Sequence, residues 1–173
     1  MRDNRALAIE RALKRGGSKI IGVDLTGYGF DKIEEDIQRE NEENPDDPVK
    51  WIVINQSHNV LSRDNDNEVL RREKNAQAGR DLGKKLGIVV IDVTQGGDSC
   101  VGKLYLDMND LFMNKTGMQG TADLIVGISA TKDMLDSGNG ERGLSFPKDK
   151  ISYQHRKIPV KLNGALSRIE DIL

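Results

Sequence analysis

The chain has 173 residues, of which 36% are apolar and 31% charged, so it is long enough to bury one hydrophobic core without disulfides or structural metals. Its 26 Lys and Arg residues against 28 Asp and Glu give a net charge of -2, which by itself indicates neither a nucleic-acid-binding nor a membrane-binding protein. The single cysteine excludes an internal disulfide, and no apolar run approaches the roughly 18 residues of a membrane-spanning helix. We therefore expect one soluble, cytoplasmic domain over residues 1–173, with no membrane partner.

The first third of the chain predicts helices and strands in alternation. Apolar residues at helical spacing predict a short helix over residues 5–14, and an apolar run predicts a strand over residues 19–25. Isoleucines one turn apart indicate a second helix over residues 31–44, which Asp31 is placed to cap. A buried strand follows at residues 51–55.

The alternation continues through residue 130. The further expected elements are a long helix over 67–86, a strand over 88–95, a mobile glycine-rich loop over 96–103, a short helix from 109, a buried strand over 122–130 and a flexible loop over 136–143. The β-branched run of residues 88–95 is typical of a strand covered on both faces.

The last thirty residues alternate in the manner of antiparallel strands around a turn at Asn163 and Gly164. Strands that alternate with helices and then give way to antiparallel pairing predict an α/β domain. Its sheet is expected to be mainly parallel, flanked by helices, with an antiparallel edge.

Polar side chains follow three of these strands. They are Asn55 and Gln56 after the first, Gln95 after the second, and Ser129 with Lys132 after the third. Each one alone is more often a satisfied loop residue than a functional group. Their common position indicates a ligand site, because ligands of open α/β sheets bind at the carboxyl ends of the strands.

Basic residues gather near the C-terminus, whereas acidic residues crowd positions 34–47. The basic residues are Lys148, Lys150, His155, Arg156, Lys157 and Lys161. A basic hairpin is suited to contact phosphate, and it is equally consistent with an edge strand that lysines keep from pairing. Neither His58 nor His155 has a partner at metal-ligand spacing.

The order of elements and particular residues together resemble the C-terminal part of the RecA-like motor of DnaB-like replicative helicases, especially those carried by bacteriophages. "WIVINQ" is similar to the Walker B strand of that family, and "IVVIDVTQ" is similar to the strand that ends in a phosphate-sensing glutamine. "LDMNDLFMNKTGMQGTADLIVGI" (106–128) is similar to the segment that follows, and "SFPKDK" resembles the finger strand. The resemblance covers roughly residues 50–173.

The resemblance implies roles for individual residues. Gln95 is expected to sense the γ-phosphate, with Asn55 and Gln56 beside the nucleotide, and Lys103 is expected to face single-stranded DNA. Lys148 and Lys150 are expected to reach a nucleotide held by the neighbouring subunit of a ring. A lysine at the position of an arginine finger is a point charge without the planar fork, so we expect a weaker finger.

Two departures from the family concern the catalytic machinery. The sequence has no G-x-x-x-x-G-K-[ST] loop, whose backbone amides, lysine and hydroxyl hold phosphates and magnesium. Asn55 stands where the family has an aspartate, so it is expected to be at most a weak Mg²⁺ ligand. We therefore expect ATP and Mg²⁺ to bind only with a partner chain, and no ATP hydrolysis by this chain alone.

Three hypotheses remain open. The chain is the C-terminal half of a helicase motor that a P-loop-bearing chain completes in a ring oligomer. Alternatively, it is an inactive helicase-like module that docks on an intact helicase or on DNA. The third hypothesis is an α/β protein without a nucleotide function.

Overall fold

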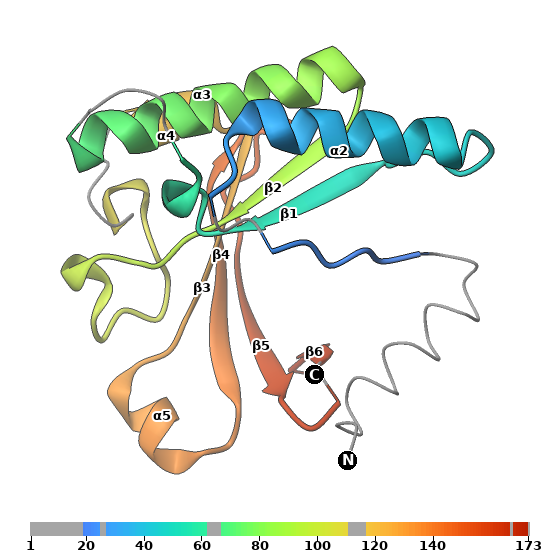
Figure 1. Ribbon diagram of the computed structural model, residues 1–173. Coiled ribbons are helices and arrows are strands. Elements are labelled where there is room, and N and C mark those ends of the chain that lie inside the picture. The colour runs from blue at the N-terminus through green and yellow to red at the C-terminus, as the bar shows by residue number, and fades with distance from the viewer. Residues whose placement is uncertain (1–18, 25–26, 62–66, 111–116, 167, 173) are drawn as a thin grey trace.

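The computed structural model describes residues 19–24, 27–61, 67–110, 117–166 and 168–172. The helix expected over residues 5–14 lies outside these ranges. Within them the strands form a two-stranded parallel sheet and a four-stranded antiparallel sheet (Figure 1). No helix in the described part of the chain is both long enough and apolar enough to span a bilayer.

The parallel sheet carries both long helices on one face (Figure 1). Its elements are α2 (Phe30–Glu43), β1 (Trp51–Asn55), α3 (Glu68–Leu86) and β2 (Val89–Val93). The main core lies between this sheet and the two helices, where Ile33, Ile37, Ile54, Val60 and Leu82 are buried. The predictions of both helices and both strands are confirmed.

The two helices differ in how their ends are capped. The N-cap of α2 is Gly29, whose residue type provides no side-chain cap, so the predicted cap by Asp31 is wrong and this residue lies in the first turn instead. At α3 the side chain of Asn67 accepts a hydrogen bond from the backbone N–H of Leu70 at 2.9 Å, which satisfies one of the free amides of the first turn. Gly87 ends α3 with a φ of 66°, a conformation that favours glycine.

The antiparallel sheet has the strand order β3-β4-β5-β6. Its strands are β3 (Leu124–Ser129), β4 (Glu141–Asp149), β5 (Lys157–Asn163) and β6 (Arg168–Asp171). The predicted turn at Asn163 and Gly164 connects β5 to β6. The mixed α/β class is as expected. More of the described strands pair antiparallel than parallel, however, because β3 pairs with β4 rather than with a parallel neighbour.

Short helices and 3₁₀ turns lie in the connecting segments, and one of them meets the short helix expected from residue 109, whose residues 111–116 lie outside the described ranges. They are α4 (Gly117–Thr121), α5 (Lys132–Ser137) and the 3₁₀ turns Ser57–Asn59, Asp98–Cys100 and Met108–Asp110. The loop expected at 96–103 thus contains a 3₁₀ turn. The loop expected at 136–143 is shorter, because α5 extends into it from one side and β4 from the other.

The strand predicted over residues 19–25 is wrong. Residues 19–24 form no strand, and Ile20, Ile21 and Val23 are each about half exposed. Strand propensity mainly reflects packing against neighbouring strands, and no described strand pairs with this segment. An ion pair between Lys19 and Glu40, at 2.6 Å, joins the segment to α2.

The expectation that β2 is covered on both faces is also wrong. Val89 is 61% exposed, Ile91 44% and Val93 45%, whereas the alternate residues face α2 and α3. Trp51 and Val53 of β1 lie on the same open side and are also about half exposed. The described helices cover one face of this sheet only, which leaves the second apolar face open.

The chain between the two sheets crosses the antiparallel sheet at small residues. Ser129 Oγ donates to the carbonyl oxygen of Leu104 at 2.6 Å, and the N–H of Leu106 donates to Ser145 Oγ at 3.1 Å. A Cβ atom at Gly143 would collide with the Leu104 carbonyl oxygen. Glycine at this position therefore allows the close approach of two backbones.

Replacing Gly143 by alanine tests this crossing. We expect Gly143→Ala to lower the free energy of unfolding by about 1–3 kcal/mol, because the added methyl group meets backbone that cannot move aside easily. Urea unfolding measures the change. Gly164→Ala is the matched control, since its Cβ meets no atom within 4 Å, and it should stay within about 0.5 kcal/mol of the parent. Equal stability of the two variants would contradict the crossing.

Candidate functional site

The carboxyl ends of β1 and β2 bring three of the predicted residues together. Asn55 is the last residue of β1 and lies in register with Val93, the last residue of β2, and Gln95 follows two residues after Val93. Gln56 has a φ of 64°, and its backbone N–H donates to the Val93 carbonyl at 2.8 Å. Asn55 and Gln95 are exposed at this edge. Asn55, Gln56 and Gln95 thus lie at one edge of this sheet, whereas Ser129 ends β3 of the antiparallel sheet and Lys132 follows it, so the three predicted strand ends do not share one edge.

A buried polar network under this edge escaped the sequence analysis. Ser57 Oγ donates to Asp92 Oδ2 at 2.5 Å, and the Ser57 N–H donates to Oδ1 of the same carboxylate at 3.2 Å. The Asn75 amide on α3 donates to the carbonyls of Ser57 and Val60 at 2.8 and 3.1 Å. These bonds fix the loop after β1. An aspartate within the apolar run "IVVIDV" was the signal that could have indicated them.

The network also bears on the predicted magnesium site. The carboxylate of Asp92, a residue in register with Ile54 near the end of β1, is already bonded to Ser57. Within the described residues, no group of three or more His, Cys, Asp or Glu side chains is arranged to hold a metal ion. Asn55 as a weak Mg²⁺ ligand stays a prediction.

Lys103 holds its own loop together. Its ammonium lies 2.7 and 3.0 Å from the two carboxylate oxygens of Asp110, which is almost completely buried. Ser99 Oγ and the Asp107 N–H also donate to Asp110, both at 2.8 Å. Burial opposes ionisation of Asp110, but these three donors outweigh it and lower the pKa of its carboxyl. The DNA contact of Lys103 stays a prediction.

The same loop contains a partial phosphate-loop pattern that the sequence analysis did not note. Residues 97–103 have the order G-x-x-x-x-G-K, but Leu104 stands where Ser or Thr is required. A phosphate loop also precedes a helix, whose N-terminal amides face the phosphates. Here the described residues 104–107 are not helical. Because Lys103 is paired with Asp110, this segment is not a phosphate cradle.

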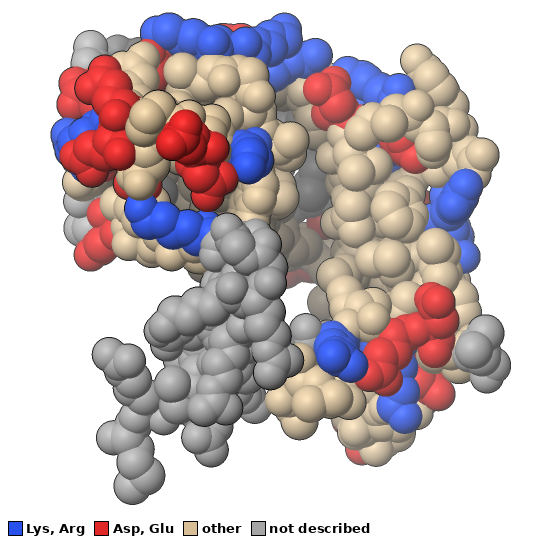
Figure 2. Space-filling view, turned by 90° about the vertical axis from the view of Figure 1, so that its right-hand side faces the viewer, with Lys and Arg blue, Asp and Glu red and all other residues tan. Residues whose placement is uncertain are grey.

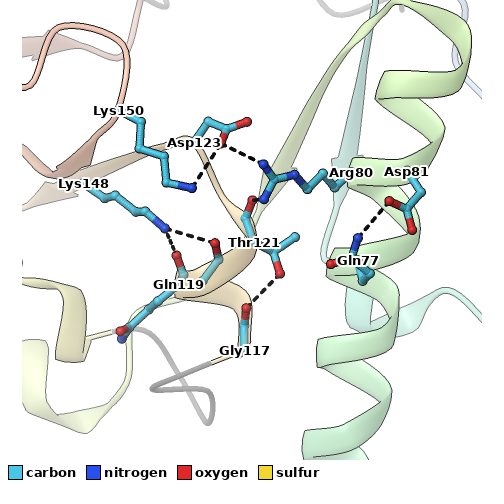
Figure 3. Close-up of polar contacts among 10 residues, drawn as sticks. Gln77, Arg80, Asp81, Gly117, Gln119, Thr121, Asp123, Lys148 and Lys150 are labelled. Carbon is cyan, nitrogen blue, oxygen red and sulfur yellow. Dashed lines mark hydrogen bonds and ion pairs between the residues drawn. The ribbon is translucent and has the colours of Figure 1, made fainter.

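Lys148 and Lys150 lie in a separate cluster between α3, α4 and the end of β4 (Figure 3). The Lys148 ammonium donates to the carbonyl oxygens of Gln119 and Gly120 at the end of α4. The Lys150 ammonium lies 3.3 Å from Asp123 Oδ1. These lysines are held by α4 and Asp123, whereas Gln56 is bonded to β2, so the structure separates the predicted residues into two groups.

Arg80 belongs to the lysine cluster and was missed by the sequence analysis. Its guanidinium donates to the Thr121 carbonyl at 2.9 Å and lies 3.4 Å from Asp123 Oδ1 (Figure 3). Arg80 and Lys150 thus pair with the same carboxylate, whereas Lys148 is bonded to backbone carbonyls. Burial lowers the pKa of Lys148 below its ordinary value, and the positive charge of Lys150 lowers it further.

The fold is similar to that of known helicase ATPase domains. The structure of one such ATPase domain matches with a TM-score of 0.71 and 12% identity, over 84% of this chain and 52% of that chain. A DnaB-like replicative helicase, solved to show its interactions with primase, matches with a TM-score of 0.70 and 12% identity, over 84% of this chain and 36% of that one. The chain thus spans about half or less of the structures it matches.

No protein-family model and no curated protein matches the sequence. At 12% identity the structural likeness shows the fold alone. The expected RecA-like fold is confirmed.

The charge coupling between Lys148 and Lys150 can be measured directly. We expect Lys150→Met to raise the pKa of Lys148, because the substitution removes the neighbouring positive charge that lowers it. NMR titration of ¹³C-labelled lysine side chains follows the change. Lys161→Met removes an exposed lysine that lies in register with Glu141, at the opposite end of β4 from Lys148, and should leave the Lys148 titration unchanged. An identical shift in both variants would contradict the coupling.

The pairing of Lys103 with Asp110 predicts non-additive stability effects. Asp110→Asn should cost about 1–3 kcal/mol, since it weakens hydrogen bonds to a charged, buried group. Lys103→Met should also destabilise the protein. The double variant should be more stable than the sum of the single effects implies, because each substitution removes the same interaction. Urea unfolding of the four proteins measures the cycle, and strict additivity would mean that the pair does not form in solution.

Proposed function

We propose that this chain is the C-terminal half of the ATPase motor of a DnaB-like replicative helicase of the bacteriophage type, and that a P-loop-bearing partner chain completes it. The observation that carries the proposal is the open apolar face of the β1–β2 sheet. The likeness of the fold to helicase ATPase domains supports the same assignment.

The open face has the composition of a surface that another polypeptide covers. Trp51, Val53, Val89, Ile91 and Val93 lie side by side on it, each 44–61% exposed. Figure 2 shows a hollow with mostly uncharged walls in the middle of one side of the molecule. Contiguous apolar patches of this kind mark interfaces in soluble proteins.

The strand count supports the same conclusion. The described parallel sheet has two strands, and a sheet of that size gains little stability unless further strands extend it. The chain covers 52% of the first helicase ATPase domain that it matches, so about half of that fold has no counterpart here. A partner that adds strands at the edge of the sheet and helices on its open face would enlarge the sheet and supply the half of the fold that has no counterpart here.

The described residues suit the remaining tasks of such a motor. Gln95 at the end of β2 is a neutral amide that can orient a phosphate oxygen or a water molecule. Lys148 and Lys150 are held by α4 and Asp123 at the end of β4, where they can act on a nucleotide of the neighbouring subunit in a ring. ATP and its Mg²⁺ belong to the partner's P-loop, and single-stranded DNA is the proposed polymer that Lys103 faces.

A second candidate function has one observation in its favour. Asn55 replaces a metal-binding carboxylate by a neutral amide, which favours an inactive module that docks on an intact helicase or on DNA. Asn55→Asp separates the two functions. In a completed motor it should strengthen Mg²⁺-dependent ATP binding, whereas in an inactive module it should change nothing.

The apolar face predicts the outcome of reconstitution. The chain is co-expressed with a polypeptide from the same genome that carries a G-x-x-x-x-G-K-[ST] loop and ends before its own Walker B strand. The emission of Trp51, the single tryptophan, should shift to shorter wavelengths as this face becomes buried, and ATP hydrolysis stimulated by single-stranded DNA should appear.

Substitutions on the open face provide the control. Val53→Glu should weaken the association by roughly ten- to hundredfold, because about 1.5–3 kcal/mol of apolar burial is lost. Leu166→Glu places the same charge at an exposed apolar residue of the β5–β6 turn and should have no effect. The split-motor proposal fails if no P-loop polypeptide binds, or if Val53→Glu binds as tightly as the parent.

A further inference from the structure

A cavity of about 390 Å³ opens between the segment 106–109 and the adjoining parts of β4 and β5. Its volume lies in the range of small-molecule sites in proteins. The predicted nucleotide residues Asn55, Gln56 and Gln95 do not line it, and neither do Lys103, Lys148 and Lys150. It is therefore a separate candidate site.

Part of the cavity lining is apolar. Leu106 and Met108 contribute from the crossing segment, and Phe146 and Pro147 contribute from β4. All four residues are half-buried. A lining that includes a phenylalanine and a proline is suited to a planar heterocycle, because every nucleobase presents a π-face.

The rim of the cavity carries positive charge without a carboxylate partner. Within the described residues, neither Arg156 nor Lys157 takes part in an ion pair, whereas Lys103, Lys150 and Arg80 each pair with an aspartate. Arg156 Nε donates to the neutral amide oxygen of Gln154 at 2.6 Å. The Lys157 ammonium lies 5.7 Å from the centroid of the Tyr105 ring. Both cations are therefore positioned by neutral groups, which leave their charge available to a ligand.

Other polar groups of the lining fit the same ligand chemistry. His155 Nδ1 lies 3.2 and 3.1 Å from the carbonyl oxygens of Phe146 and Pro147, so Nδ1 carries the proton that these acceptors require. Asp107 is the one acidic side chain of the lining, and its charge also acts on Lys103, whose pKa it helps to raise. Because Arg156 and Lys157 are basic and Asp107 is the one acidic residue of the lining, the net charge of the lining is positive.

We propose that this cavity binds one nucleotide unit, with its phosphate at Arg156 and Lys157 and its base against the wall that Phe146 and Pro147 form. The unit is either a free nucleotide or one nucleotide of a single strand, since both present the same base and phosphate. The choice of a nucleotide among planar anions rests on the proposed function. The positive apolar cavity itself does not depend on it.

The experiment measures binding to the purified full chain without a partner and without ATP hydrolysis. The probes are ATP in the absence of Mg²⁺, fluorescently labelled dT15 and inorganic tripolyphosphate. The variant Arg156→Gln/Lys157→Gln removes both rim charges, and the backbone bond from the Phe146 N–H to the Arg156 carbonyl does not involve these side chains. The matched control Lys84→Gln/Arg168→Gln removes two exposed charges away from the cavity. Thermal unfolding confirms that all proteins are folded.

The cavity variant is expected to bind ATP or dT15 about tenfold more weakly than the parent at 0.1 M salt, while the control double variant binds as the parent does. For dT15, the slope of log K against log salt should become shallower by about 0.7, since the one phosphate contact that is lost contributes about 0.7 on a single strand. Loss confined to ATP identifies a free nucleotide as the ligand, and loss confined to dT15 identifies a strand.

Two results would overturn the proposal. Equal affinities of the cavity and control variants for both nucleotide probes would exclude phosphate binding at this rim. Tripolyphosphate that binds as tightly as ATP would show an anion site without a place for the base. Neither result bears on reconstitution of the ATPase, so failure of this site and failure of the split motor are distinguishable.

Discussion

The structure depends on the β1–β2 sheet, which has helices packed on one face and no described element packed on the other. In register, Ile54 of β1 pairs with Asp92 of β2, and successive residues point to opposite sides. One side packs against α2 and α3 and contains the described core of this unit. The other side is equally apolar and exposed. A single parallel pair thus produces both the folded core and the surface from which we infer a missing partner.

The basic side chains also fall into two groups. One group is bonded to carboxylates or carbonyl oxygens of this chain, and the other has only neutral neighbours. Lys103 and Lys150 neutralise buried or clustered carboxylates, and Lys148 satisfies carbonyl groups at the end of α4. Their first effect is to hold loops and strand ends in place. Arg156 and Lys157 have neutral neighbours instead. The basic residues are therefore not one uniform surface, because a cation that pairs within the chain must exchange that partner for a ligand, whereas Arg156 and Lys157 have no carboxylate to exchange among the described residues.

The sequence predicted those features that depend on local periodicity and failed where the outcome depends on distant partners. The helices at 31–44 and 67–86 and the strands at 51–55 and 88–95 follow from the spacing of apolar residues. The segment 19–25 has an equally good strand pattern, but a strand also needs a neighbour. The gathering of Asn55 and Gln95 followed from the topology of parallel strands. The contact of Arg80 with Asp123 joins residues 43 positions apart, and no spacing rule indicates it.

Asn55 lies on the open face of the sheet, and this position accounts for its lack of charge. Asn55 lies in register with Val93, and both alternate with the buried Ile54 side of the sheet, so Asn55 shares the open side with Trp51 and Val53. A partner that covers this apolar face also removes water from the end of β1. An unpaired carboxylate there would be costly to desolvate, whereas an amide costs much less. Asparagine at this position therefore suits a surface built for burial, and a completed motor must obtain its metal-binding charge from the chain that buries it.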